Sequence, residues 1–207
     1  MRVKFSYGDN VISALKHRVI LNAKNLVGWH SKRRIVVFSV DDYGNVRIDS
    51  RAAREQMRNQ GLKINNRFDA YDALETRADL EALFDVLTSV TDSKGSHAVC
   101  TPFAVPCNID FEKVRDAGCR EYHYERLPET FRKQSARHPE AYEGAWELWQ
   151  EGVQGGFMVP QFHGREHVNL KVFEEQLAAK NQELLIALQN RSYSSISLSG
   201  YNTISPM

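Results

Sequence analysis

The residues of this sequence best suited to chemistry begin with two adjacent carboxylates, Asp41 and Asp42, directly after the apolar segment Ile35–Val40. Neighbouring carboxylates repel each other unless a cation or a proton compensates their charge. Adjacent residues of an extended chain also point in different directions. One carboxylate could therefore bind a metal ion while the other faces a substrate. The competing interpretation is an Asp-rich turn or helix cap, which the following Tyr43 and Gly44 would also suit.

Two histidines, His163 and His167, follow a second apolar segment, Phe157–Phe162. Their spacing lets both imidazoles reach one ion if the chain turns helically between them. Taken alone, they could equally be two unrelated histidines in a loop. Together with Asp42 they supply one carboxylate and two imidazoles, a typical ligand set for Zn²⁺ or for another first-row ion such as Co²⁺ or Ni²⁺. We therefore predict a metal site made of Asp42, His163 and His167.

Strands that alternate with helices must position these side chains. Residues 35–40 are β-branched and aromatic, which predicts a strand buried on both faces of a parallel sheet or barrel. Further strands are expected at residues 97–104 and 157–162. Because the connections between them read as helices, the sequence indicates βα units and a parallel sheet. Both motifs then lie at the carboxyl edge of that sheet, where active sites of such folds are found.

The expected helices follow from caps and apolar spacing. Residues 76–79 form a capping-box pattern, and apolar residues at helical spacing follow over 80–87. Trp146 and Trp149 could stack on sugar rings, but their helical spacing favours core packing. Other helices are expected at residues 11–27, 50–59, 111–117, 140–155 and after Asn169. Residues 121–125 read as a strand or an extended loop, and residues 184–188 as a strand or a helix.

Length and composition limit the class of protein. The chain has 207 residues, of which 42% are hydrophobic, enough for one core with an appendage. We expect a lead-in helix within residues 1–33 and an α/β domain over 34–207. The 27 basic and 26 acidic residues give a net charge of +1, which provides no electrostatic case for binding nucleic acid or an anionic membrane. The three basic residues at 32–34 are interpreted as solvent-exposed charges directly before the first strand.

The number of cysteines and the lengths of the apolar segments indicate the cellular compartment of the protein. Cys100, Cys107 and Cys119 are odd in number and share no metal-ligand spacing, so a disulfide framework is not expected and a reducing compartment is favoured. The N-terminus lacks the apolar stretch of a signal peptide, and no run approaches 18 apolar residues. These features predict a cytoplasmic protein without a membrane span.

The two motifs carry a resemblance to a known family. The strand that ends in Ser39-Val40-Asp41-Asp42 resembles the first motif of the polysaccharide deacetylases, carbohydrate esterases of the chitin-oligosaccharide deacetylase type. The segment 163–167 resembles their second motif, His-x-x-x-His. The resemblance covers about residues 34–170. It implies that Asp41 is the catalytic base, that Asp42 and both histidines hold the metal, and that the substrate is an N- or O-acetylated carbohydrate.

The same resemblance implies a distorted (β/α) barrel of seven strands, and the sequence departs from it in several places. About 120 residues separate the two motifs, more than expected for the family. Asp-Asp-Tyr-Gly is closer to the related diacetylchitooligosaccharide deacetylases, which also use an Asp, His, His metal set. The later family motifs, with an Arg that orients the base and a His that acts as general acid, are not found after His167. Since only about four core strands can be counted, we expect either a small, irregular barrel or one that is incomplete in this chain.

Three functional interpretations follow. The first is a metal-dependent hydrolase that removes an acetyl group from a carbohydrate. The second is a catalytically impaired relative that binds a glycan or a partner protein. The third is a structural α/β domain in which both motifs occur by chance. The sequence does not identify the sugar, the acetyl linkage or the oligomeric state.

Overall fold

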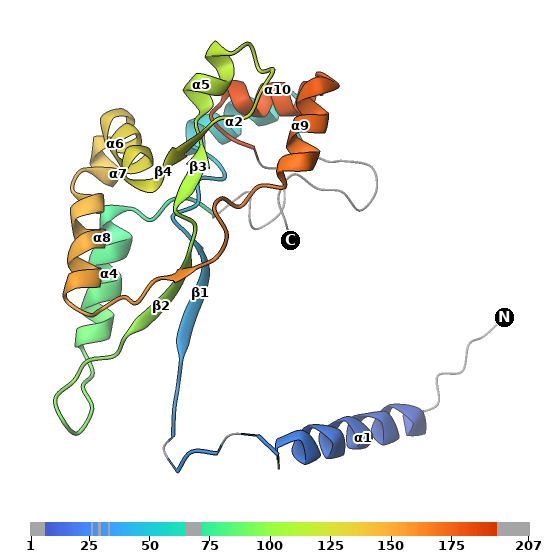
Figure 1. Cartoon of the computed structure of the whole chain (residues 1–207), viewed down its shortest axis with the longest axis vertical. Coiled ribbons are helices and arrows are strands. Elements are labelled where there is room, and N and C mark those ends of the chain that lie inside the picture. The colour runs from blue at the N-terminus through green and yellow to red at the C-terminus, as the bar shows by residue number, and fades with distance from the viewer. Residues whose placement is uncertain (1–6, 26, 29, 33, 65–71, 194–207) are drawn as a thin grey trace. The chain divides into compact units, whose positions relative to one another are not determined.

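The computed structural model describes residues 7–25, 27, 28, 30–32, 34–64 and 72–193 (Figure 1). The chain divides into two compact units, Met1–Val36 and Val37–Met207. The first unit contains helix α1 (Tyr7–Asn25), in the region where a helix was expected over residues 11–27. The residues predicted to hold the metal all belong to the second unit.

Three parallel strands carry the predicted motifs. They are β1 (Phe38–Tyr43), β2 (Cys100–Ala104) and β5 (Gln161–Phe162), in the spatial order β1-β2-β5. Both pairs of neighbours are parallel, as the alternation of strands and helices predicted. Because the three strands run in one direction, the residues that follow them gather at one edge of the sheet.

Strand β1 differs from its prediction in position and in burial. It begins at Phe38, three residues later than expected, and continues through both aspartates to Tyr43. The side chains of Phe38 and Val40 are 55% and 46% exposed, so the prediction of a strand buried on both faces was wrong. The physical reason is that burial of a strand's faces depends on which elements pack over them. Within the described residues β1 is also an edge strand that pairs with β2 alone.

Two helices lie next to each other along the sheet, α4 (Arg77–Thr88) and α8 (Ala145–Gln154) (Figure 1). The capping box predicted before α4 is present, because the Thr76 side chain accepts from the Asp79 N–H while the Asp79 carboxylate accepts from the Thr76 N–H. Trp149 of α8 is buried in the hydrophobic core, and Trp146 packs against that core half-buried. The prediction that these tryptophans serve packing is confirmed.

The segment before α8 corrects two predictions. Residues 140–155 form two helices rather than one, α7 (Pro139–Tyr142) and α8. Gly144 separates them with a φ of +77°, a left-handed conformation that ends a helical path and that glycine adopts at little cost. Helix α6 (Leu127–Arg137) was not predicted. Its proline lies in the first turn, where the missing N–H has no helical partner to lose.

The remaining elements surround the carboxyl end of the sheet. Strands β3 (Cys107–Ile109) and β4 (Tyr124–Arg126) pair antiparallel, which resolves residues 121–125 partly as a strand. The segment at 184–188 is helical. The other helices are α2 (Arg51–Asn59), α5 (Phe111–Asp116), α9 (Leu170–Ala178) and α10 (Gln182–Gln189).

The second unit is therefore a mixed α/β fold. Its described strands form one three-stranded and one two-stranded sheet, and neither closes into a barrel. The three cysteines are free thiols. Among the helices that the structure describes, none has the length and apolar character needed to cross a membrane.

Candidate metal centre

Asp42 reaches across the sheet because the backbone of β1 is irregular at this residue. The register with β2 shifts between Val40 and Tyr43, and Asp42 has a φ of +65°. Strands β1 and β5 are separated by β2, and two strand spacings amount to roughly 10 Å. The Asp42 carboxylate nevertheless meets the two histidines that follow β5. Backbone outliers of this kind concentrate at functional sites.

The three residues predicted as metal ligands come together. The Nε2 atom of His167 lies 3.1 Å from Asp42 Oδ1, and the Nε2 atom of His163 lies 3.4 Å from the same oxygen. One ligand atom from each residue lies within 4.8 Å of the other two. The imidazole rings are nearly parallel, with an interplanar angle of 19° and centroids 6.1 Å apart.

The chain between the two histidines follows bends rather than the helical turn that was expected. Helix α9 begins only at Leu170, and Gly164 has a φ of +101°. The segment is held to neighbouring strands, since the His163 N–H donates to the Ala104 carbonyl at 3.0 Å and the Cys107 N–H donates to the Arg165 carbonyl at 2.9 Å. The two imidazoles therefore converge through long-range contacts, which the sequence spacing did not disclose.

A cation fits the donor atoms that converge here. Asp42 Oδ1 is buried and has no hydrogen-bond partner in the part of the chain that the structure describes. Burial lowers the pKa of His167, and the Asp42 carboxylate partly opposes this shift. A divalent ion at this point would be attracted by the carboxylate oxygen and by the lone pairs of both neutral imidazoles. Asp42, His163 and His167 thus fit a divalent metal.

Glu75 holds the turn that follows the metal-site aspartate. Its carboxylate accepts from the Gly44 N–H at 2.9 Å and 3.1 Å and lies 3.5 Å from the Trp149 Nε1. Burial raises the pKa of Glu75 to about 7, although the bond from Gly44 opposes the shift. Sequence reasoning missed this residue. The only signal was its position directly before the capping box of α4.

Asn108 holds the same turn from the other side. Its Oδ1 accepts from the Val46 N–H at 2.9 Å, and its Nδ2 donates to the Gly44 carbonyl at 2.8 Å and lies 3.3 Å from Thr130 Oγ1. The side chain is 3% exposed. A buried amide that satisfies one donor and one acceptor of a turn fixes its backbone. No sequence pattern pointed to Asn108.

Arg47 is a third residue that sequence reasoning missed. Its Nη2 lies 3.7 Å from Asp42 Oδ2, and its Nε lies 2.6 Å from Asp72 Oδ2. The Arg47 side chain is 9% exposed, and its backbone carbonyl accepts from the Tyr193 N–H at 3.2 Å. A charged residue between the apolar neighbours Val46 and Ile48 was the available sequence signal.

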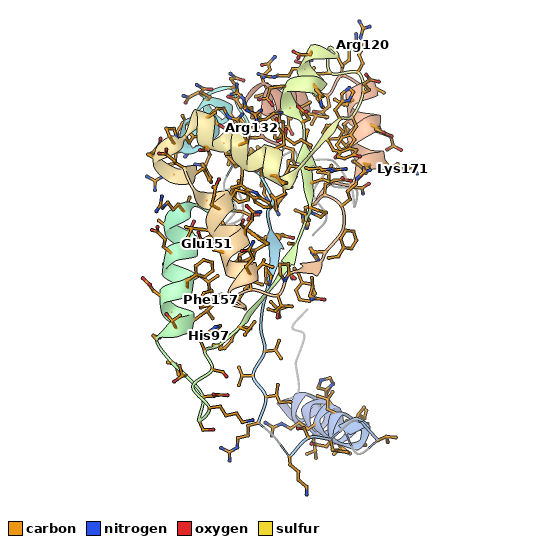
Figure 2. All side chains as sticks on the ribbon, turned by 60° about the vertical axis from the view of Figure 1, so that its left-hand side comes forward. His97, Arg120, Arg132, Glu151, Phe157 and Lys171 are labelled. Atoms are coloured by element: carbon orange, nitrogen blue, oxygen red, sulfur yellow. The ribbon has the colours of Figure 1, made fainter. Side chains whose placement is uncertain are left out.

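The other residue assigned to the chemistry, Asp41, is not part of this cluster. It is exposed on β1, next to Asp42 in the chain. His97 lies elsewhere, near the amino end of β2, where its ring stacks on Phe157 with centroids 4.5 Å apart (Figure 2). The structure thus places Asp41 at an exposed position of β1, adjacent in the chain to one of the three converging ligands.

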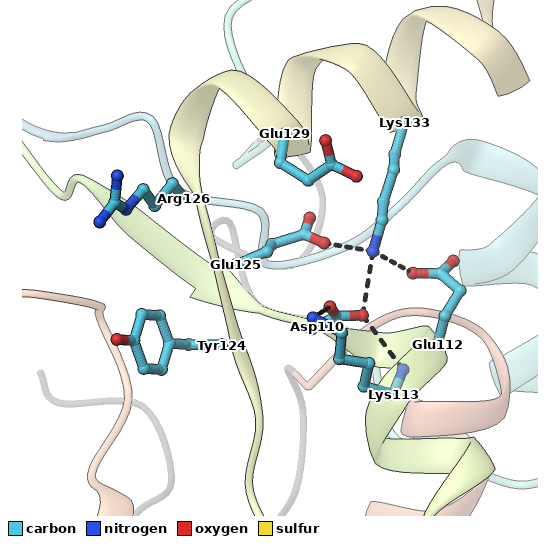
Figure 3. Close-up of a pocket in the computed structure, with 8 residues that line it drawn as sticks. All are labelled: Asp110, Glu112, Lys113, Tyr124, Glu125, Arg126, Glu129 and Lys133. Atoms are coloured by element: carbon cyan, nitrogen blue, oxygen red, sulfur yellow. Dashed lines mark hydrogen bonds and ion pairs between the residues drawn. The ribbon is translucent and has the colours of Figure 1, made fainter.

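A second acidic group contains its own cation. The Lys133 ammonium bonds to Asp110 Oδ1 and Glu112 Oε2, each at 2.9 Å, and to Glu125 (Figure 3). Burial alone would lower the pKa of Lys133, but the hydrogen bonds that its ammonium donates to the three carboxylates raise it above its ordinary value. The ammonium bridges the three carboxylates, and Glu112 also pairs with Arg137 and Arg191. The group joins β4 and α6 to the start of α5.

No family model matches this chain, and no similar protein was found among curated proteins or solved structures.

Proposed function

We propose that this protein is a metal-dependent hydrolase that removes an acetyl group from an N- or O-acetylated carbohydrate. The observation that carries the proposal is the approach of two imidazoles, at 3.1 Å and 3.4 Å, to one buried carboxylate oxygen of Asp42. The same three residues match the metal positions in the two polysaccharide deacetylase motifs. Zn²⁺ is the preferred ion because the donor set is nitrogen and carboxylate oxygen, and Co²⁺ or Ni²⁺ would suit the same donors.

The fold is compatible with this proposal at a coarse level. We infer that the parallel strands β1, β2 and β5 correspond to part of the distorted (β/α) barrel of that family. Support comes from the parallel direction of all three strands and from the site at their carboxyl ends. This is the end at which barrels of parallel strands carry their active sites.

In the proposed mechanism, Asp42, His163 and His167 hold the ion. When bound, a divalent ion favours loss of a proton from water and polarises a carbonyl group. Asp41 is the base that accepts the proton from the attacking water. Its exposure suits this task, because a base must be reachable by water and by substrate. The left-handed conformation of Asp42 allows its carboxylate to serve the ion while Asp41, one residue earlier, remains at the surface.

The experiment combines metal analysis with acetate release from acetylated chitin and xylan oligosaccharides, in the presence of Zn²⁺, Co²⁺ or Ni²⁺. The Asp42→Ala and His167→Ala variants should lose stoichiometric metal. The Asp41→Asn variant should keep the metal and lose about 10²-fold or more in turnover. Asp85→Asn, at an exposed position of α4, is the control and should retain both properties.

Each outcome has a distinct meaning. A wild-type protein that takes up none of the three ions would contradict the metal site. Full turnover by Asp41→Asn would show that Asp41 is not the base. Stoichiometric metal without acetate release from any substrate would contradict the hydrolase and favour a glycan- or partner-binding domain.

A further inference from the structure

The two oxygens of the Asp42 carboxylate face different partners. Oδ1 faces the imidazoles of His163 and His167, as described above. Oδ2 lies 3.7 Å from Nη2 of Arg47, which is an ion pair rather than a hydrogen bond. Oδ1 can thereby bind a metal ion, whereas Oδ2 lies against the positive charge of Arg47.

The guanidinium of Arg47 is itself held in place. Its Nε forms a close ion pair with Asp72 Oδ2 at 2.6 Å, and the side chain of Asp72 is 24% exposed. The Arg47 side chain is buried, and its backbone carbonyl is bonded to the Tyr193 N–H. Arg47 therefore meets its two carboxylates through two different nitrogens, a geometry that a planar guanidinium provides and a single ammonium does not.

The charges of this group determine what Arg47 contributes. A lone arginine beside a metal ligand would repel a divalent cation. Here the negative charge of Asp72 compensates the positive charge of Arg47, so their combined effect on a nearby cation is small. What remains is the attraction of the guanidinium for the nearer oxygen, Oδ2, which favours the orientation of the Asp42 carboxylate that keeps Oδ2 on Arg47. Partners that orient a metal ligand in this way commonly change metal affinity by about 10- to 100-fold.

We propose that Arg47, held by Asp72, is a positioning residue that keeps Oδ1 of Asp42 directed toward the metal ion and prevents the carboxylate from turning its other oxygen to it. The inference rests on the metal site under the proposed function. Metal affinity and ligand geometry then depend on Arg47 and Asp72, although neither residue contacts the ion. Arg47 and Asp72 act through Asp42 and take no part in the reaction.

The test measures Co²⁺ binding by the visible absorption spectrum of the full chain. The variant Arg47→Met/Asp72→Asn removes both charges and leaves the net charge unchanged. It should bind Co²⁺ about tenfold or more weakly, with altered d–d bands because the carboxylate can rotate. Arg47→Lys keeps the positive charge but replaces the two nitrogens that meet Asp42 and Asp72 by one ammonium, and it should show a comparable loss. Arg58→Met is the control, because this arginine is 55% exposed on α2, and it should bind as the wild type does.

The results separate this inference from the metal site itself. Co²⁺ binding by wild type that disappears in Asp42→Ala, together with wild-type affinity and spectrum in Arg47→Lys, would overturn the positioning role and leave the metal site intact. Failure of wild type to bind Co²⁺ would overturn the metal site first. Circular dichroism checks the fold of each variant. If the double variant is unfolded, the folded Arg47→Lys variant decides the question alone.

Discussion

At the scale of single residues, the carboxylates of Asp42 and Glu75 lie in different charge environments. Asp42 is flanked by two imidazoles and an arginine, whereas Glu75 is met by backbone and indole N–H groups without a positive charge. Burial without a cation disfavours the ionised form. This is why the pKa of Glu75 rises to about 7.

The raised pKa of Glu75 predicts a pH dependence of stability. The unfolded chain loses this proton near the ordinary pKa of 4.5 and the folded chain near 7. Between these values the folded state binds more protons, so the free energy of unfolding falls as the pH rises. From pH 5 to pH 8 this group should reduce the stability of wild type by about 2–3 kcal/mol.

The Glu75→Gln variant should lack this decrease, because an amide can accept the Gly44 N–H without a charge. Urea unfolding at pH 5 and pH 8 measures the difference. Glu151→Gln, at an exposed position of α8 labelled in Figure 2, should follow wild type. Equal pH dependence in Glu75→Gln and in wild type would show that Glu75 is not the group responsible.

At the scale of elements, the turn after β1 is the segment on which the site depends. Asn108 of β3 and Glu75, which precedes α4, bond to its backbone from two directions. Gly44, at the centre, has a φ of +81°. A Cβ at this position would lie 2.9 Å from the Val105 carbonyl oxygen and 3.0 Å from a methyl group of Leu127. The turn is thus strained for other residues and closely packed.

We therefore expect Gly44→Ala to destabilise the protein and to weaken metal binding. The left-handed backbone conformation costs about 1–2 kcal/mol for alanine, and the contact with the Val105 carbonyl adds about 1–3 kcal/mol. Gly61→Ala is the matched control, because Gly61 has a φ of +94° with nothing within 4 Å of an added Cβ. It should show the backbone cost alone. Thermal unfolding and Co²⁺ titration of both variants provide the comparison, and equal losses of stability would contradict the packing argument.

At the scale of the whole molecule, segments far apart in the sequence meet at a few polar groups. Lys133 of α6 connects carboxylates at the start of α5 and on β4, and its side chain is 16% exposed. The Tyr193 hydroxyl donates to Asn45 Oδ1 at 2.9 Å and lies 3.2 Å from the carbonyl of His167. The metal centre therefore depends on the packing of the second unit over most of its length.

Removal of the Lys133 charge should be strongly destabilising. Lys133→Met leaves the carboxylates of Asp110, Glu112 and Glu125 close together without the ammonium, and loss of one partner of such a buried group costs about 3–5 kcal/mol. Lys113→Met is the control, since this lysine is 67% exposed and pairs with Asp110 at 3.2 Å. It should cost no more than about 1 kcal/mol. Chemical denaturation distinguishes the two, and a loss below about 1 kcal/mol in Lys133→Met would refute the structural role of this cluster.

The sequence by itself determined the local features of this protein. The capping box before α4, the parallel direction of the strands and the choice of Asp42, His163 and His167 all followed from residue types and short spacings. The capping box depends on interactions within a few residues, which the order of residues records directly. The strand direction followed from the alternation of strand-like and helix-like segments, and the three site residues from two short motifs at predicted strand ends.

Only the tertiary structure decided how these parts meet. The exposure of β1 depends on which elements cover it, and the left-handed conformation of Asp42 depends on contacts made by the turn that follows it. The partners Arg47 with Asp72, and Asn108 with Gly44, are 25 and 64 residues apart. Contacts over such separations leave no periodic or motif signal in one sequence, because they are set by packing rather than by local backbone preference.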